Sequence, residues 1–365
     1  MTAAHGGGPS VLGGRGTDLQ RLRARAIAAL SVAACHLPEG PLFAGADAIG
    51  ELWYRTSPAR AAMARRNLGR VTAWLAAEGR GPVRARRAAT DPTALESLVR
   101  SAFRQNARYY LESLRAPAMT EAYLEDRLEK VDADVLDRAL AEPGGVVVVA
   151  AHFGPIEVAS AVVVDGRSGD VAGAMEAVDD PELQAWIARS RAGRRLRFVG
   201  LGEARRELKR VLAGGGAALL VADRDISGGG TEVRLFGHPA PLPSGPALLA
   251  IEASVPIYFA AVRRAGTGRY IGTMRELQVP AEGRLRDRAI AVLDATARAI
   301  EDAVATAPDQ WSAVFFPIWP DLESTAWADG AATTAGADGA AATAGADGAG
   351  GADGTSGAAT AGLTR

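Results

Sequence analysis

The sequence predicts an α/β fold in which a mostly parallel or mixed central sheet is flanked by helices and preceded by an N-terminal helical region. Two features of the chain lead to this prediction. Up to about residue 141 apolar residues recur at helical spacing, whereas from residue 145 short β-rich apolar runs alternate with helical stretches. The 365-residue chain is 48% hydrophobic, which is enough apolar material to bury a sizeable core.

The helical region is expected to cover about residues 18–141. Its first helix begins near Leu19 and ends at Pro38 and Gly40, because proline and glycine stop helices. The periodicity predicts further helices over about 45–55, 57–77, 93–114 and 120–141.

The α/β core is expected to cover about residues 142–322. Its strands are predicted at VVVVAA (146–151), DVAGAM (170–175), LRFVGL (196–201), AALLVAD (217–223) and VPIYFAAVRR (255–264). Because these runs are almost continuously apolar, we expect a sheet that is covered on both faces, with parallel strand pairs.

Both ends of the chain are expected to be disordered, which leaves one folded domain at 18–325. Residues 1–17 are Gly-rich and lack periodicity, and 326–365 repeat Ala-Asp-Gly units in which Asp329, Asp338 and Asp347 lie nine residues apart. A nine-residue Asp/Gly period is also found in calcium-binding β-rolls. Those rolls need a large aliphatic residue in each repeat, and here Ala and Thr take its place.

Composition excludes several classes of protein. The formal net charge of −1 gives no global basic field, so no nucleic-acid partner is expected. A single cysteine and four histidines argue against a disulfide framework and a metal site. No dinucleotide-binding glycine motif, P-loop or serine-hydrolase elbow is present, and no apolar run is long enough to span a bilayer.

The first helix has two open interpretations. It carries Leu19, Leu22 and Leu30 beside Arg23 and Arg25, a composition typical of cationic amphipathic helices that lie on a membrane surface. An Arg-rich solvent face on an ordinary packed helix would look the same.

The segment AAHFGPIE (150–157) is the strongest candidate for chemistry. His152 directly follows the apolar run at 146–151, and in open α/β sheets ligands bind at the carboxyl ends of strands. An imidazole there can act as a base near neutral pH, and a carboxylate bonded to its other ring nitrogen would fix its tautomer. A turn at Gly154-Pro155 would bring Glu157 back under the ring. A structural His–Glu pair or cap is the alternative.

The order of several motifs gives the chain a family resemblance. The segment His-Phe-Gly-Pro-Ile-Glu resembles the H-x4-[D/E] motif of the lysophospholipid acyltransferase superfamily. Around it the chain is similar to bacterial lipid A lauroyl/myristoyl acyltransferases and to their actinobacterial relatives, the phosphatidylinositol mannoside acyltransferases, over about residues 20–322. The motifs that carry the resemblance are Arg66-Asn67-Leu68, Phe103-Arg104, Tyr109-Tyr110, Arg189 to Arg195, Ala222-Asp223-Arg224-Asp225, Gly230 to Val233, Leu235-Phe236-Gly237, Leu242 to Pro246, Trp311 and Phe315 to Trp319.

The resemblance implies an acyl-CoA-dependent O-acyltransferase that needs no cofactor and no metal. His152 would be the general base that deprotonates a sugar hydroxyl of a glycolipid acceptor, and Glu157 would orient and polarise it. Glu232 aligns with a second acidic position near the histidine, although an exposed glutamate at a strand edge is an equal alternative. Backbone N–H groups near Phe153 and Gly154, or an arginine, would stabilise the oxyanion.

Further residues are expected to bind substrate. The arginines between 189 and 197 suit the phosphates of CoA or of an inositol phosphate headgroup, or form a solvated helix end. Arg224 would bind phosphate or pair with its flanking aspartates, and Ser244 lies in the segment that resembles the border of an acyl groove. The expected substrate-binding residues are Arg189, Arg191, Arg194, Arg195, Arg224, Phe153, Gly154 and Ser244.

The departures from the lipid A enzymes favour the mannoside branch. Those enzymes usually read H-F-G-N-W-E, and many carry an N-terminal membrane-spanning helix that is missing from this sequence. We therefore expect a peripheral protein on the cytoplasmic face of the plasma membrane that acylates a mannose of phosphatidylinositol mannoside. A lipid A-type or lysophospholipid acceptor, and an inactive lipid-binding scaffold, are the alternatives.

Overall fold

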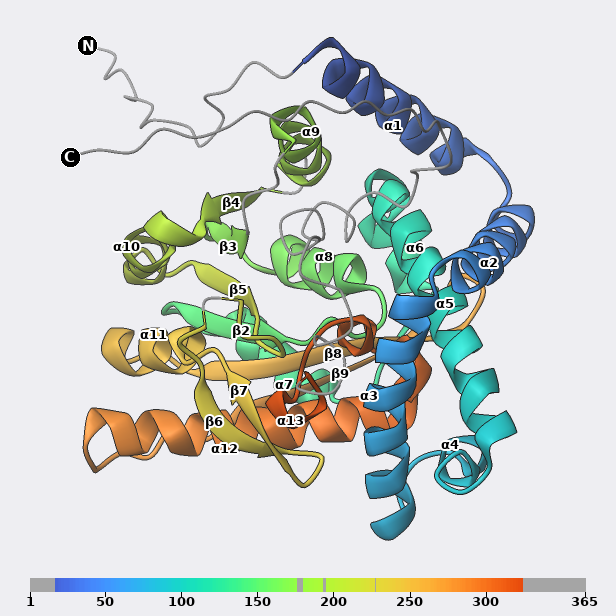
Figure 1. Cartoon of the computed structure of the whole chain (residues 1–365). Helices are drawn as coiled ribbons and strands as arrows, with labels where there is room; N and C mark the ends of the chain where they lie inside the picture. The colour runs from blue at the N-terminus through green and yellow to red at the C-terminus, as the bar shows by residue number, and fades with distance from the viewer. Residues whose placement is uncertain (1–16, 176–179, 193–194, 227, 324–365) are drawn as a thin grey trace, which may run out of the picture.

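The computed structural model describes residues 17–175, 180–192, 195–226 and 228–323. The low-complexity tail and almost all of the Gly-rich N-terminus, which we expected to be disordered, lie outside these residues, as does Arg194. Within the described residues the chain forms an α/β structure in which N-terminal helices lie beside a central sheet (Figure 1). The expected fold class is confirmed.

Bounds close to those expected are found for three helices, Asp18–His36, Pro58–Ala77 and Pro92–Leu114, whereas the helix expected over 45–55 already begins at Glu39 and the short helix Val83–Arg87 was not predicted. Thr17 forms a capping box with Gln20, and the Asp91 side chain accepts hydrogen bonds from two amides at the start of its helix. The helices and short 3₁₀ turn of this part are α1 Asp18–His36, α2 Glu39–Thr56, α3 Pro58–Ala77, α4 Val83–Arg87, α5 Pro92–Leu114 and η1 Ala116–Ala118.

The prediction of one helix over 120–141 is wrong. The structure breaks this stretch into α6 (Glu121–Glu125), strand β1 (Leu128–Lys130) and α7 (Ala133–Ala141). The strand pairs in parallel with Tyr270 to Gly272, a contact between segments some 140 residues apart that local periodicity does not report. The sheet therefore begins inside the region that we expected to be wholly helical.

All five strands predicted from apolar runs are present, and the described residues contain four further strands that were not predicted. The remaining elements are β2 Val146–Ala150, α8 Ile156–Gly166, β3 Val171–Met175, α9 Pro181–Ala192, β4 Leu196–Gly200, α10 Leu201–Ala213, β5 Ala217–Val221, β6 Thr231–Leu235, β7 His238–Leu242, α11 Gly245–Ala253, β8 Ile257–Gly266, β9 Arg269–Leu277, α12 Leu285–Thr306, η2 Pro308–Gln310, η3 Ser312–Phe315 and α13 Pro320–Glu323.

Among the described residues seven strands form one sheet in the order β1-β9-β8-β2-β5-β3-β4, and β6 and β7 form a separate hairpin. Neighbouring strands in the sheet are parallel except β8 and β9. The chain leaves β2 toward β3 on one side and leaves β5 toward β8 on the other. The carboxyl ends of β2 and β5 therefore form a topological switch point, the place where open α/β sheets bind ligands.

The strand β2 is apolar throughout because both faces of the sheet are covered. Val147 and Val149 belong to the large core formed with α10, α11, α12 and the N-terminal helices, whereas Val146 and Val148 pack on the other face with residues of α7 and α8. Figure 1 shows the helices α8 and α12 on opposite sides of the sheet. Both faces of the strand that leads into His152 are therefore packed against helices.

Candidate active site

His152 is bonded to Asp223, not to Glu157. Its Nδ1 lies 2.7 Å from Asp223 Oδ1, and its main-chain N–H donates to Oδ2 of the same carboxylate at 2.9 Å. The register explains the pairing: Ala150 of β2 lies opposite Val221 of β5, so the residues two positions further on also face each other. The expectation that Glu157 bonds this ring nitrogen is therefore corrected by the structure.

The pair is arranged with its acid inside and its base at the surface. The Asp223 side chain is completely buried, whereas 30% of the His152 side chain is exposed. Burial alone would raise the pKa of Asp223, but the attraction and hydrogen bond of His152, together with the bond from the Trp311 indole, hold that pKa below its ordinary value of 3.8. An ionised carboxylate only accepts hydrogen bonds, so Nδ1 carries the proton and Nε2 is left as the basic nitrogen.

The loop that carries His152 turns sharply and leaves no room for a side chain at Gly154. This glycine has φ +58°, and a Cβ there would lie 2.0 Å from the carbonyl oxygen of Val262 on β8. The N–H of Phe153 donates to Ala151 O at 2.7 Å, and that of Gly154 donates to Gln310 O at 2.9 Å. Because internal carbonyls occupy both N–H groups, the structure does not support the expectation that they serve as oxyanion donors.

The other two predicted acids lie elsewhere. Glu157 is buried in the first turn of α8, where it accepts a hydrogen bond from Ser113 Oγ of α5 at 3.2 Å. Glu232 is exposed on the hairpin strand β6. Neither takes the place that the structure gives to Asp223 beside the His152 ring.

The arginine stretch 189–197 is described only in part. Arg195 donates to the main-chain oxygens of Val164 and Arg167, both at 2.7 Å, and so caps the end of α8. These contacts give Arg195 a structural role, and phosphate binding by Arg195 stays a prediction. Arg189 is exposed on α9, and the side chain of Arg191 lies outside the described residues.

Arg224 directly follows Asp223 in the sequence. Its guanidinium stacks over the Phe316 ring, with 3.6 Å between the central guanidinium carbon and the ring centroid. On α3, Arg60 also lies over this ring, at 5.2 Å. Ser244 is half-buried at the N-terminus of α11, and its side chain makes no capping hydrogen bond there.

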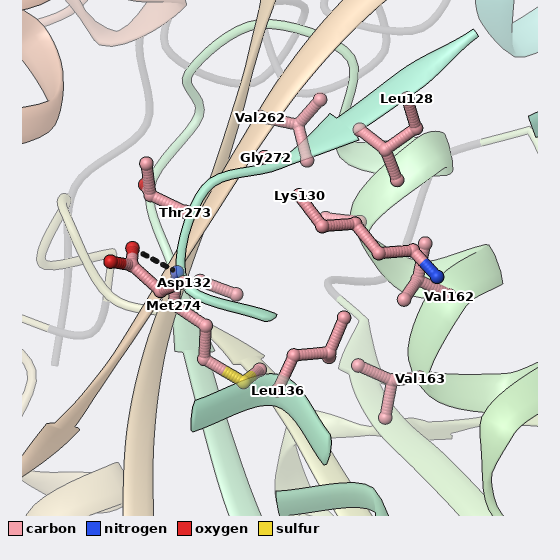
Figure 2. Close-up of a pocket in the computed structure, with 12 residues that line it drawn as sticks. Leu128, Lys130, Asp132, Leu136, Val162, Val163, Val262, Gly272, Thr273 and Met274 are labelled. Carbon is pink, nitrogen blue, oxygen red and sulfur yellow. Dashed lines mark hydrogen bonds between the residues drawn. The ribbon is translucent and has the colours of Figure 1, made fainter. Parts of the chain in front are cut away.

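A mainly apolar pocket lies between α8 and the β1-β9-β8 edge of the sheet. Its wall includes Val262, the residue against which Gly154 packs, so the pocket adjoins the His152 loop through β8. Figure 2 shows its aliphatic side chains together with Lys130 and with Asp132, which accepts a hydrogen bond from the N–H of Met274 at 3.2 Å. The residues lining it are Leu128, Lys130, Asp132, Leu136, Ala159, Val162, Val163, Ala260, Val262, Gly272, Thr273 and Met274.

Two residues of this site escaped the sequence reasoning in their present roles. From the sequence, Asp223 was recognised only as part of the Ala222-Asp223-Arg224-Asp225 motif and as a flank of Arg224, and Trp311 only as part of a motif. Nothing local signals either role, since Asp223 lies 71 residues and Trp311 159 residues from His152. The available signal was the position of Asp223 at the end of another apolar strand.

Large parts of this chain are similar in sequence to known proteins. Residues 24–316 match the family model described as bacterial lipid A biosynthesis acyltransferase. The chain is 29% identical over 167 residues to phosphatidylinositol mannoside acyltransferase of Mycolicibacterium smegmatis, covering 45% of this chain and 55% of that protein. It is 31% identical over 151 residues to the protein of the same name from Mycobacterium tuberculosis, covering 40% of this chain and 48% of that one. The alignments thus span about half the length of these relatives.

Proposed function

Since the chain belongs to the bacterial lipid A biosynthesis acyltransferase family, we propose that it transfers a long fatty acyl chain from acyl-CoA to a sugar hydroxyl of a glycolipid. A mannose of phosphatidylinositol mannoside is the proposed acceptor, because the relatives described above carry that name. The observation that carries the proposal is the buried Asp223 bonded to a partly exposed His152 at the switch point of the sheet.

The geometry supports a direct transfer with His152 as general base. Nε2 of His152 takes the proton of the acceptor hydroxyl while the oxygen attacks the thioester carbonyl carbon. When the tetrahedral intermediate collapses, the carbon–sulfur bond breaks, and the imidazolium returns the proton to the CoA sulfur. Asp223 keeps the proton on Nδ1 and stabilises the imidazolium, as the acid does in Ser-His-Asp triads. The acceptor is itself the nucleophile, so no enzyme nucleophile is required.

We propose that an arginine, the second alternative given by the sequence, stabilises the oxyanion. With the N–H groups of Phe153 and Gly154 engaged internally, Arg224 is the proposed donor, or alternatively the ligand of a substrate phosphate. We further propose that the apolar pocket beside α8 takes the end of the acyl chain, because its walls are apolar and it adjoins the His152 loop.

We also propose that α1 and α2 rest on the cytoplasmic face of the plasma membrane. Leu19, Leu22 and Leu30 on α1 and Ile49 and Leu52 on α2 are each more than half exposed. On α1 the inward face is instead built from small residues, so the large aliphatic side chains point away from the protein. The exposed Arg25 adds positive charge that favours anionic lipid. No helix among the described residues is long and apolar enough to cross a bilayer.

The membrane proposal is tested by co-sedimentation with anionic phosphatidylglycerol vesicles. A chain with Leu22→Glu and Leu30→Glu should lose most of its binding, whereas the matched variant Val83→Glu, which changes an exposed valine on α4, should bind like the unaltered protein. Equal binding by all three proteins would refute the assignment of this face.

The activity is tested with radiolabelled palmitoyl-CoA and phosphatidylinositol mannosides. Transfer should fall by several orders of magnitude in His152→Ala and should be unchanged in His238→Ala, which alters an exposed histidine on β7. Lipid A precursors and lysophospholipids are offered in parallel, and acylation of one of these alone would assign the acceptor to that class. Absence of transfer to any acceptor by the folded protein would favour the lipid-binding scaffold.

A further inference from the structure

The short segment that follows α12 contacts both members of the His152–Asp223 pair. The Trp311 indole N–H donates to Asp223 Oδ2 at 2.7 Å, and the N–H of Ser312 donates to the carbonyl oxygen of His152 at 2.7 Å. Phe153 and Trp311 form an antiparallel β-bridge. Residues 310–312 therefore contact both the loop that carries the base and the carboxylate that orients it.

Gln310 ties the same segment to the sheet. Its side-chain Oε1 accepts from the N–H of Arg264 at 2.8 Å, and its Nε2 donates to the carbonyl oxygen of Arg264 at 3.0 Å. β8 extends beyond its pairing with β2, which ends at Phe259, so the Gln310 amide supplies hydrogen bonds that a neighbouring strand would otherwise make. Its own carbonyl oxygen accepts from Gly154.

Both ends of this connection are anchored in the protein interior. The Arg264 guanidinium is buried against Glu112 of α5, with its Nε 2.8 Å from Oε2. The carboxylate of Asp309, also buried, accepts from Ser101 Oγ at 2.7 Å and from Arg84 at 2.9 Å. Side chains held in this way keep their rotamers, which is what the support of a catalytic group requires.

We infer that Gln310 and Trp311 are positioning residues for the His152–Asp223 pair. The inference rests on the proposed role of His152 as a base. Because an indole N–H can only donate, Trp311 holds Asp223 Oδ2 and leaves Oδ1 directed at Nδ1 of the imidazole. Gln310 sets the distance between β8 and the His152 loop. Neither residue has to touch substrate for this role.

The test compares two buried tryptophans of one aromatic cluster. Trp319 lies 6.3 Å from Trp311 between ring centroids, is equally buried, and donates its indole N–H to the Leu235 carbonyl at 3.1 Å. Trp311→Phe and Trp319→Phe therefore each remove one buried hydrogen bond, but only the first bond is made to Asp223. Trp311→Phe should lose more stability than Trp319→Phe in denaturant unfolding, because it leaves a buried carboxylate instead of a neutral carbonyl without its donor.

The kinetic readout separates positioning from folding. In Trp311→Phe, kcat should fall about 10- to 100-fold with KM unchanged, the range expected for losing a hydrogen bond to a charged group. The kcat of Trp319→Phe should stay within about 3-fold of that of the unaltered protein, a smaller change than the loss of one such hydrogen bond would cause. Gln310→Glu, which keeps the shape but loses the N–H bond to the Arg264 carbonyl oxygen, should behave like Trp311→Phe.

A second readout does not depend on activity. The low-field proton resonance of the His152 Nδ1–H bond, assigned by its loss in His152→Ala, should shift or broaden in Trp311→Phe and Gln310→Glu and stay unchanged in Trp319→Phe. Equal kcat in the two tryptophan variants together with an unshifted resonance would overturn the inference. Should His152→Ala itself keep full activity, the proposed function fails, and the resonance alone decides whether these residues position the pair.

Discussion

Replacing Asp223 by asparagine should disable the proposed base through its tautomer. The carboxylate accepts three hydrogen bonds: Oδ2 takes those from the main-chain N–H of His152 and from Trp311 Nε1, and Oδ1 lies against Nδ1. Because both partners of Oδ2 are donors, the asparagine oxygen must occupy that position. Its NH₂ group then faces Nδ1, which can receive this hydrogen bond only without its proton. The proton moves to Nε2, and the nitrogen needed for catalysis is no longer basic.

The magnitude follows from the cost of a wrong tautomer in a buried pair. An Asp→Asn change of this kind in a serine protease, a separate and well-studied system, lowers kcat by about 10⁴-fold, so we expect a fall in kcat of about 10³- to 10⁴-fold here. By the transition-state relation this is about 4–5.5 kcal/mol. The fold should survive, since the change is isosteric and each of the three contacts keeps a hydrogen bond.

Acyl transfer from palmitoyl-CoA measures the kinetic effect, and ¹⁵N chemical shifts of the imidazole report which nitrogen carries the proton. Asp180→Asn is the matched control, because Asp180 is also buried and caps α9 instead of contacting His152. A kcat of Asp223→Asn within tenfold of the unaltered protein would refute the tautomer argument. So would a spectrum in which Nδ1 of that variant still carries the proton.

Four further outcomes are expected. Glu157→Gln should lower kcat by less than about tenfold, since Glu157 bonds Ser113 and does not orient the His152 ring; a loss as large as that of Asp223→Asn would return the orienting role to Glu157. Gly154→Ala should lower kcat/KM by about 100-fold, because a Cβ 2.0 Å from the Val262 oxygen must displace the loop by about 1 Å; unaltered kinetics would contradict this close approach of loop and strand. Ala159→Leu should reduce turnover of palmitoyl-CoA relative to decanoyl-CoA, by about fourfold for each methylene excluded from the pocket; an unchanged ratio would place the acyl chain elsewhere. Finally, the folded-state pKa of Asp223 lies below 3.8, so its contribution to stability is complete above that pH and is lost as pH falls through the lower value; urea unfolding should show Asp223→Asn losing less stability than the unaltered protein below about pH 3.8, and parallel curves would contradict this.

Local sequence predicted the parts of the fold that local forces determine. The strands β2, β5 and β8 are continuous apolar runs because helices cover both faces of the sheet, and such runs can be recognised without knowing their neighbours. The strand β1 could not be found in this way. It has three residues, of which only Leu128 is buried, and it is extended because it pairs with β9. Between two helical stretches it resembles a continuation of them.

The sequence correctly placed His152 at the end of a buried strand but chose the wrong acid as the partner of its ring. That the histidine follows a buried strand is local information. Which acid reaches its ring depends on the order of strands in the sheet: β5, not β3, lies beside β2, and the register then places Asp223 opposite His152. Glu157, only five residues away, instead begins a helix whose first turn directs its carboxylate toward α5.

The position of the acid also explains why the site is built from distant parts of the chain. A buried carboxylate is tolerated only if donors surround it, and the loop at the end of β2 supplies two of the three that Asp223 receives, both from His152. The third must come from an element that crosses this edge of the sheet, and the segment after α12 provides it through Trp311. That segment is itself fixed to β8 by Gln310. Changes at Trp311 should therefore act on the base as strongly as on the stability of the fold, and this joint effect distinguishes a support of the site from an ordinary core residue.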